Sequence, residues 1–285
     1  MTSDVNKSFK SKLRALAQEQ RRDPADLWQT LMLERFLARL AQTPMSNHFI
    51  LKGAILLSKY VDIGRETRDL DFLARNISSK IDHLQGVFEK IAEVDLKDGF
   101  KFENVKALEL KHSHMGYPGA EVSMCCYFGK TRSKISIDLG FGDIIEPLEY
   151  SIQLMHSVKG PLFENCVRLK CYPKEFIFAE KLETIVYRGA LNSRMKDFHD
   201  LHSLVAYSHA YPLNRLSNIL KLVFDHRQTP LNLPLKFTEG EIEQLQSFWN
   251  GYLKNLKRER ATELPKEIKA LIEIINSWLS AIQLS

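Results

Sequence analysis

Two aspartates on one predicted strand have the types and the spacing to do chemistry. Asp69 and Asp71 alternate with the apolar residues Leu70 and Phe72. Alternate side chains of a strand point to the same face, roughly 6.5 to 7 Å apart, so the two carboxylates lie side by side while Leu70 and Phe72 face a core. Like charges so close repel, and a cation that binds both removes that cost. Mg²⁺, a hard ion that prefers oxygen ligands, suits such a pair, although Asp-x-Asp also occurs at solvated strand edges and turns.

A glycine turn ahead of this strand predicts a phosphate site. Lys52, Gly53 and Ala54 precede a helix that we expect from Ile55 to Asp62. The free N–H groups at a helix start, together with the positive end of the helix dipole, favour phosphate. A phosphate site beside a metal site is the minimum equipment for handling a nucleoside triphosphate.

A third carboxylate strengthens the metal hypothesis. The run from Lys134 to Leu139 alternates polar and apolar residues, which predicts a half-buried strand with Asp138 on its polar face. If this strand pairs beside the Asp69–Asp71 strand, three carboxylates converge, and such a patch can hold two metal ions about 3.5 to 4 Å apart. The alternative is a strand-end aspartate that leads into a glycine turn. Asp143, which lies beyond the strand among glycines, is the poorer candidate.

The motifs, in their order, resemble the nucleotidyltransferase superfamily of the DNA polymerase β type, and more closely its AbiEii/AbiGii toxin branch. The resemblance covers roughly residues 8 to 207. One departure from the superfamily is Ala54, which stands where Gly or Ser is usual. Alanine is small enough for the close approach to phosphate but supplies no hydroxyl. The motifs that carry the resemblance are Phe49–Ala54, Thr67–Asp71, Ile137–Asp143, Ala179–Glu183 and Lys196–Leu201.

The resemblance assigns further residues to an active site. It implies that Lys181 grips the triphosphate, and that Asp197 or Asp200 acts as a base or holds Lys181 in position; which of the two does so stays open. From the residues alone, Asp197 and Asp200 stand three apart on one helix face and could equally be a charged surface. The resemblance implies nucleotide binding by Lys181 and by four residues of the first two motifs, which are Lys52, Gly53, Ala54 and Arg68.

Length and composition are those of an ordinary globular protein. The chain has 285 residues, of which 44% are hydrophobic and 26% charged, and its net charge of +5 neither demands nor excludes a nucleic acid partner. We expect no membrane span and a cytoplasmic location, since no apolar run approaches about eighteen residues. The four cysteines form no CxxC pair and are expected to be buried free thiols rather than zinc ligands.

The pattern of elements predicts an α+β fold, with an α/β nucleotidyltransferase core and a mixed sheet. We expect N-terminal helices in residues 1–45, the nucleotidyltransferase domain in 46–170 and a helical domain in 171–285, with the catalytic cleft between the last two. Strands are expected at Asp69–Ala74, Phe102–Leu110, Glu121–Phe128, Ile135–Leu139, Ile152–Met155 and Cys166–Leu169.

Taken together, these features predict a metal-dependent nucleotidyltransferase that moves a nucleoside monophosphate from an NTP to an acceptor. The resemblance implies a toxin of a bacterial toxin–antitoxin or phage-defence system, with two Mg²⁺ ions during catalysis, tRNA or another RNA as acceptor, and an antitoxin that need not bind directly. The enzymatic alternative is a small-molecule (aminoglycoside-type) or protein acceptor. The alternative from another class is a catalytically inactive, nucleotide-binding regulator.

Overall fold

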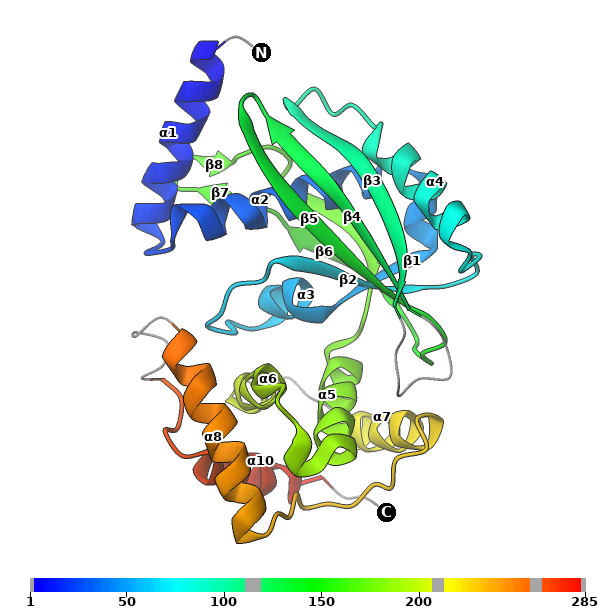
Figure 1. The fold of residues 1–285 in the computed structure, drawn as a ribbon, viewed down its shortest axis with the longest axis vertical. Helices are drawn as coiled ribbons and strands as arrows, with labels where there is room; N and C mark the ends of the chain where they lie inside the picture. Colours follow the sequence, from blue (N-terminus) through cyan, green and yellow to red (C-terminus); the bar gives the residue numbers. More distant parts are fainter. Residues whose placement is uncertain (1–2, 111–118, 207–212, 257–262, 283–285) are drawn as a thin grey trace. The chain divides into compact units, whose positions relative to one another are not determined.

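A computed structural model describes residues 3–110, 119–206, 213–256 and 263–282. The chain divides into two compact units. Unit 1 comprises residues 1–59, 66–143 and 147–172, and unit 2 comprises residues 60–65, 144–146 and 173–285. In Figure 1, unit 1 is coloured blue to green and most of unit 2 light green to red.

A seven-stranded sheet forms the centre of unit 1, in the order β3-β4-β5-β2-β1-β9-β6. β2 pairs in parallel with β5, and β1 with β9, while the other neighbours are antiparallel, so the sheet is mixed. The α+β class with a mixed sheet that the sequence predicts is therefore confirmed. The strands are β1 (Phe49–Lys52), β2 (Asp69–Ala74), β3 (Phe100–Leu110), β4 (Gly119–Phe128), β5 (Thr131–Gly140), β6 (Leu148–Gln153) and β9 (Cys166–Cys171); β7 (His156–Ser157) and β8 (Gly160–Pro161) form a separate small pair.

Helices α2 (Pro24–Ala41) and α4 (Ile81–Ala92) cover one face of this sheet. Aromatic rings from both helices meet there: Phe36 of α2 stacks on Phe88 of α4, and Phe49 of β1 packs edge-on against both Phe88 and Phe72. Because Phe72 alternates with Asp71 along β2, this core lies on the face opposite the carboxylates. Helix α1 (Ser3–Glu19) packs on α2 in the same unit.

A buried ion-pair cluster fixes α2 to the sheet. Asp98 accepts hydrogen bonds from Arg35 (2.7 Å) and Arg39 (2.9 Å), and Arg39 also donates to the carbonyl of Phe100. The side chains of all three charged residues are at most 2% exposed. Removing one member would leave an uncompensated buried charge, which typically costs about 3–5 kcal/mol.

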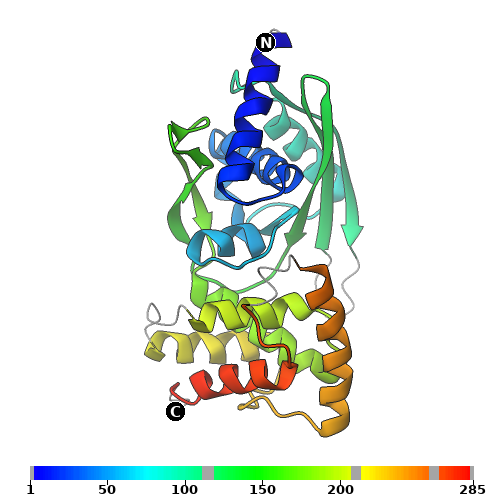
Figure 2. The ribbon, with the colours of Figure 1, turned by 90° about the vertical axis from the view of Figure 1, so that its left-hand side faces the viewer.

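The regular secondary structure of unit 2 is helical over its described residues. Figure 2 shows its helices packed around one another, and its core includes Phe178, Leu182, Phe198, Leu220 and Trp249, each fully buried. The helices are α5 (Lys174–Arg188), α6 (Met195–Ala206), α7 (Leu213–His226), α8 (Glu239–Asn255) and α10 (Ile268–Leu279), with a short 3-10 turn η2 (Gly189–Leu191) after α5 and another, η1 (Pro44–Asn47), before β1 in unit 1. Among the described helices, not one combines the length and apolar composition that crossing a lipid bilayer requires.

Four expectations from the sequence need correction. The strand expected at Ile152–Met155 is β6, which runs from Leu148 to Gln153. The helix after the glycine turn, α3, begins at Gly53 itself and ends at Tyr60, rather than running from Ile55 to Asp62. The segment Phe49–Lys52, for which the sequence pattern predicts no strand, is the strand β1. The thiols are not all buried: Cys166 is exposed and Cys125 half-buried, because both side chains alternate away from the core face of their strands.

Candidate active site

The register of β2 on β5 places Asp71 directly beside Asp138. The row continues to both sides, since Lys52 of β1 pairs with Asp71 and Glu121 of β4 pairs with Asp138. Paired residues of neighbouring strands share a face, so three acidic side chains and one lysine lie in line across four strands. All four are only partly exposed. The structure therefore brings together Lys52, Asp71 and Asp138, which the sequence singled out separately.

The first residue of α3 lies against this row. Gly53 has a φ of +72°, a conformation that favours glycine. A Cβ at this position would lie 1.9 Å from Oδ2 of Asp71, so the carboxylate occupies the space that any larger residue would fill. The start of α3, with its free N–H groups, is thus adjacent to the carboxylate row. Ala54, the second residue of the helix, is partly exposed there.

Asp69 begins β2, two residues before Asp71, and Arg68 immediately precedes the strand. Asp69 pairs with Ser136 of β5, on the same face as Asp71, and accepts a hydrogen bond from Thr67 (3.3 Å). The Arg68 side chain is 82% exposed and lies 3.9 Å from Asp26. Within the described residues, no three carboxylate, imidazole or thiol groups are gathered as a set that could hold a metal ion.

Asp143, which the sequence makes a poorer candidate than Asp138, contacts the lysine of the carboxylate row. Lys52 Nζ donates to Asp143 Oδ2 (3.0 Å), and the Tyr172 hydroxyl donates to the same oxygen (3.2 Å). The ammonium also lies 5.3 Å from the centre of the Tyr172 ring. A Cβ on Gly140 would be 3.4 Å from Lys52 Nζ, so the glycine leaves room for the lysine to cross β2 toward Asp143. Asp143 lies in the loop after β5, and Gly140 leaves the space for this contact.

The remaining predicted residues form a buried ion-pair cluster in unit 2. Lys181 of α5 contacts Asp197 Oδ1 (3.0 Å) and Asp200 Oδ2 (2.7 Å), both on α6. Arg65, from the loop after α3, binds both oxygens of Asp200 (2.8 and 2.7 Å), and Arg194 contacts Asp197 (3.0 Å). Sequence reasoning missed Arg65, because an arginine in a loop far away in the chain gives no local sign of a partner.

Electrostatics hold this cluster in its charged form. Burial opposes the charge of Asp200, yet the Lys181 ammonium and the Arg65 guanidinium lower the pKa of Asp200 well below its usual range. Burial likewise opposes the charge of Lys181, but Asp200 and Asp197 raise the pKa of Lys181. Asp200 is fully buried, whereas the Lys181 side chain keeps 15% of its surface exposed. Asp200 is therefore an anchor for cations and a weak proton acceptor.

His199 belongs to the same region of unit 2 and shows no sign of metal binding among the described residues. Its Nδ1 is hydrogen-bonded to the Tyr252 hydroxyl (2.7 Å). Burial lowers the pKa of His199 to about 4. Near neutral pH it is therefore an uncharged packing residue.

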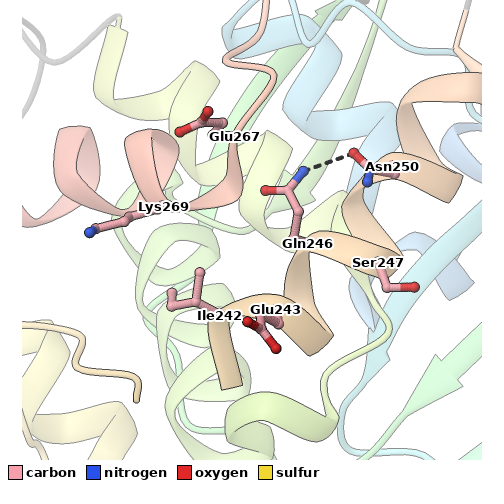
Figure 3. Close-up of a pocket in the computed structure, with 7 residues that line it drawn as sticks. All are labelled: Ile242, Glu243, Gln246, Ser247, Asn250, Glu267 and Lys269. Atoms are coloured by element: carbon pink, nitrogen blue, oxygen red, sulfur yellow. Dashed lines mark hydrogen bonds between the residues drawn. The ribbon is translucent and has the colours of Figure 1, made fainter. Parts of the chain in front are cut away.

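A surface hollow of unit 2 is shown in Figure 3. Gln246 donates to Asn250 across its wall (2.8 Å). None of the residues predicted for catalysis lines it, so this hollow is not the candidate active site. Its lining residues, from α8 and the beginning of α10, are Ile242, Glu243, Gln246, Ser247, Asn250, Glu267 and Lys269.

Comparisons with solved structures identify the fold. The chain is similar to JHP933 from Helicobacter pylori, with a TM-score of 0.50 and 17% identity over 90% of this chain and 94% of that one. It is also similar to a Helicobacter pylori protein that its description proposes to be a nucleotidyltransferase, with a TM-score of 0.52 and 16% identity over 92% of this chain and 99% of that one. No curated protein gives a significant match to the sequence.

The family comparison is decisive. Residues 35–274 match the model of the family described as "Nucleotidyl transferase AbiEii toxin, Type IV TA system". The matched range contains both the carboxylate row of unit 1 and the Lys181 cluster of unit 2. This protein therefore belongs to the AbiEii nucleotidyltransferase toxin family of type IV toxin–antitoxin systems.

Proposed function

We propose that this nucleotidyltransferase transfers a nucleoside monophosphate from an NTP to a hydroxyl of an RNA, with tRNA as the expected class. The observation that carries the proposal is the row Lys52–Asp71–Asp138 beside the glycine start of α3. Acceptors for a metal ion and donors for phosphate occur together there. Such transfers depend mainly on positioning and on neutralising charge, and both need this kind of site.

The donor set suits Mg²⁺. Asp71 and Asp138 offer oxygen ligands from adjacent strands, and Asp69 offers a third from the same face. Among the described residues these three carboxylates are not gathered as a metal-binding set, so they would hold the ion by closing around it as it binds. Bound Mg²⁺ would neutralise phosphate charge and make the attacking hydroxyl more acidic. It would also relieve the repulsion between Asp71 and Asp138, whose positions side by side are otherwise unfavourable.

The chain's own groups would orient the two substrates. The N–H groups at the start of α3 favour the phosphates, and the Lys52 ammonium on the same face adds positive charge. The acceptor oxygen forms a bond to the α-phosphorus, the bond between the α-phosphorus and the bridging oxygen breaks, and pyrophosphate leaves. The hydroxyl gives its proton to a solvent water in the same step.

Lys181 is proposed to contact the triphosphate, as the family resemblance implies. Of its two partners, Asp200 is assigned the task of holding Lys181 rather than that of a base, because Lys181 and Arg65 keep its carboxylate ionised. Asp197 contacts Lys181 from the preceding turn of α6 and holds it from a second side. A fixed ammonium loses less conformational entropy when phosphate binds than a free one would.

Membership of a toxin family implies an antitoxin partner and a nucleotide substrate. RNA as the acceptor, and a cytoplasmic reaction in which NTP and RNA are both at hand, are parts of the proposal. The experiment is incubation with each α-labelled NTP and Mg²⁺ in the presence of total RNA, total protein or an aminoglycoside. The label should enter RNA and pyrophosphate should be released. Both signals should be lost with Asp71→Asn.

Other outcomes identify the alternatives. Label in protein or in the aminoglycoside would replace RNA as the acceptor. Calorimetric NTP binding that requires Mg²⁺, without pyrophosphate release in any mixture, would favour a regulator that retains the site but not turnover. Full activity of Asp71→Asn would contradict the assignment of the carboxylate row.

A further inference from the structure

The carboxylate row is one of four parallel rows on the same face of the sheet. The next row toward the hairpin between β4 and β5 contains Lys106, Ser123 and Ser136. The last two rows are Glu103–Cys125–Lys134 and Lys101–Tyr127–Arg132. Since paired residues share a face, all of these side chains extend from the surface that carries Asp138.

The character of this face changes from acidic to basic away from Asp138. Lys101, Lys106, Arg132 and Lys134 are all exposed. The three rows beyond the carboxylates contain these four cations and one acidic residue, Glu103. They therefore carry a local excess of three positive charges. The helices α2 and α4 pack on the other face, and Figure 2 shows β3, β4 and β5 along the right-hand side of unit 1, with these helices to their left.

Aromatic and apolar surface lies among these cations. The Arg132 guanidinium is 5.8 Å from the centre of the partly exposed Tyr127 ring and donates to Cys125 Sγ (3.1 Å). Leu108, in the row of Asp138, is 62% exposed. A basic surface with an accessible ring is the combination that binds single-stranded nucleic acid, because cations hold the phosphates while bases stack on the ring.

We infer that this face of β3, β4 and β5, here called the basic face, is the track along which the acceptor RNA strand reaches the Asp71–Asp138 row. The inference rests on the proposed function and adds where the acceptor binds. The row of Arg132 is six residues from that of Asp138 along β5, or about 20 Å. That length accommodates several nucleotides of a strand whose terminal hydroxyl lies at the carboxylates.

Charge explains why the cations lie at the far rows. The carboxylates at the site repel the phosphates of an RNA, so the strand needs attraction elsewhere to bring its end close to them. Arg132, Lys134, Lys101 and Lys106 supply that attraction along one line of approach.

The test is a salt titration of RNA binding. Binding of a labelled single-stranded RNA of roughly 12 nucleotides is measured over a range of salt concentrations for the wild type and for Arg132→Gln/Lys134→Gln. Each phosphate contact contributes about 0.7 to the slope of log affinity against log salt for a single strand, so the double variant should lose about 1.4 from that slope. NTP binding should be unchanged.

Two further variants serve as controls. Arg132→Lys/Lys134→Arg keeps both charges and should keep the wild-type slope. Lys80→Gln/Lys90→Gln removes two exposed charges beside and on α4, on the other face of the sheet, and should also keep it. Both target positions are exposed, and melting curves check that every variant is folded.

The possible results separate the basic face from the proposed function. An unchanged slope for Arg132→Gln/Lys134→Gln, in a protein that transfers nucleotide to RNA, overturns the track and leaves the function intact. If the slope falls equally in the basic-face variant and in the α4 control, the effect is one of net charge only. That result also overturns the basic face as the RNA track. A wild type that labels protein or a small molecule but neither binds nor labels RNA refutes both.

Discussion

The carboxylate of Asp71 occupies the space that a side chain on Gly53 would need. A Cβ at Gly53 would lie 1.9 Å from Oδ2 and 2.7 Å from Cβ of Asp71. The turn that opens α3 and the strand that carries the carboxylates are therefore fitted to each other. The proposed phosphate and metal halves of the site therefore cannot be altered independently.

Replacing Gly53 with Ala should both strain the turn and displace Asp71. The left-handed conformation costs an L-residue about 1–2 kcal/mol, and the displaced carboxylate should reduce nucleotide transfer severely. Denaturant unfolding and transfer rates measure the two effects. Gly86→Ala is the control: a Cβ there meets nothing within 4 Å in helix α4, so it should stabilise the protein by about 1 kcal/mol with full activity.

A double-mutant cycle isolates the clash. If Gly53→Ala costs as much in an Asp71→Gly background as in the wild type, the loss comes from the turn alone and not from Asp71.

Removing Lys181 should affect both nucleotide use and stability. Lys181→Ala takes one of two cations from the fully buried Asp200, and we expect a loss of about 3 kcal/mol, limited by the Arg65 that remains. Transfer should fall through weaker NTP binding, and Lys181→Arg should restore it only in part, because a planar guanidinium displaces the phosphate. Lys196→Ala, exposed on the same helix as Asp197, should be neutral. Wild-type kinetics in folded Lys181→Ala would remove this lysine from the active site.

Asp143→Asn should weaken NTP binding through Lys52. The variant keeps the shape of the side chain but removes the charge that holds the Lys52 ammonium, whose Nζ lies 3.0 Å from Oδ2 of Asp143. We expect a higher KM for NTP with a smaller change in kcat, together with a loss of about 1–3 kcal/mol in stability. Tyr172→Phe, which removes only the hydroxyl donor to Asp143, should show the same direction with a smaller effect. An unaltered KM in folded Asp143→Asn would limit Asp143 to a structural role.

His199 should make stability depend on pH between about 6.5 and 4. Its folded-state pKa of about 4 is below the unfolded value, so the unfolded chain takes up a proton first as the pH falls. Stability from this group is present above pH 6.5 and decreases by up to about 3 kcal/mol as the pH approaches 4. His199→Gln should flatten this part of the curve of unfolding free energy against pH. The pKa of His202 is also lowered by burial, so a smaller slope should remain. A slope that is identical in wild type and His199→Gln would contradict the assignment.

Much of the fold followed from local pattern, because the alternation of strands and the periodicity of helices are local properties. The runs around Asp69–Phe72 and Lys134–Leu139 identify their strands and put the aspartates on the polar face of each. The sequence pattern does not predict β1, because this strand has only four residues and its polar and apolar residues do not alternate. It is buried between β2 and β9. Such a strand is defined by its neighbours and not by its own sequence.

The sequence by itself therefore determined that Asp69, Asp71 and Asp138 are candidates for the chemistry and which way they face on their own strands. Only the tertiary structure decided which of them meet. The register that sets Asp71 beside Asp138, the reach of Lys52 to Asp143 and the binding of Arg65 to Asp200 join residues 67, 91 and 135 positions apart. Pairing of this kind depends on how whole elements pack, since a shift of a single residue in a strand would turn every side chain to the other face.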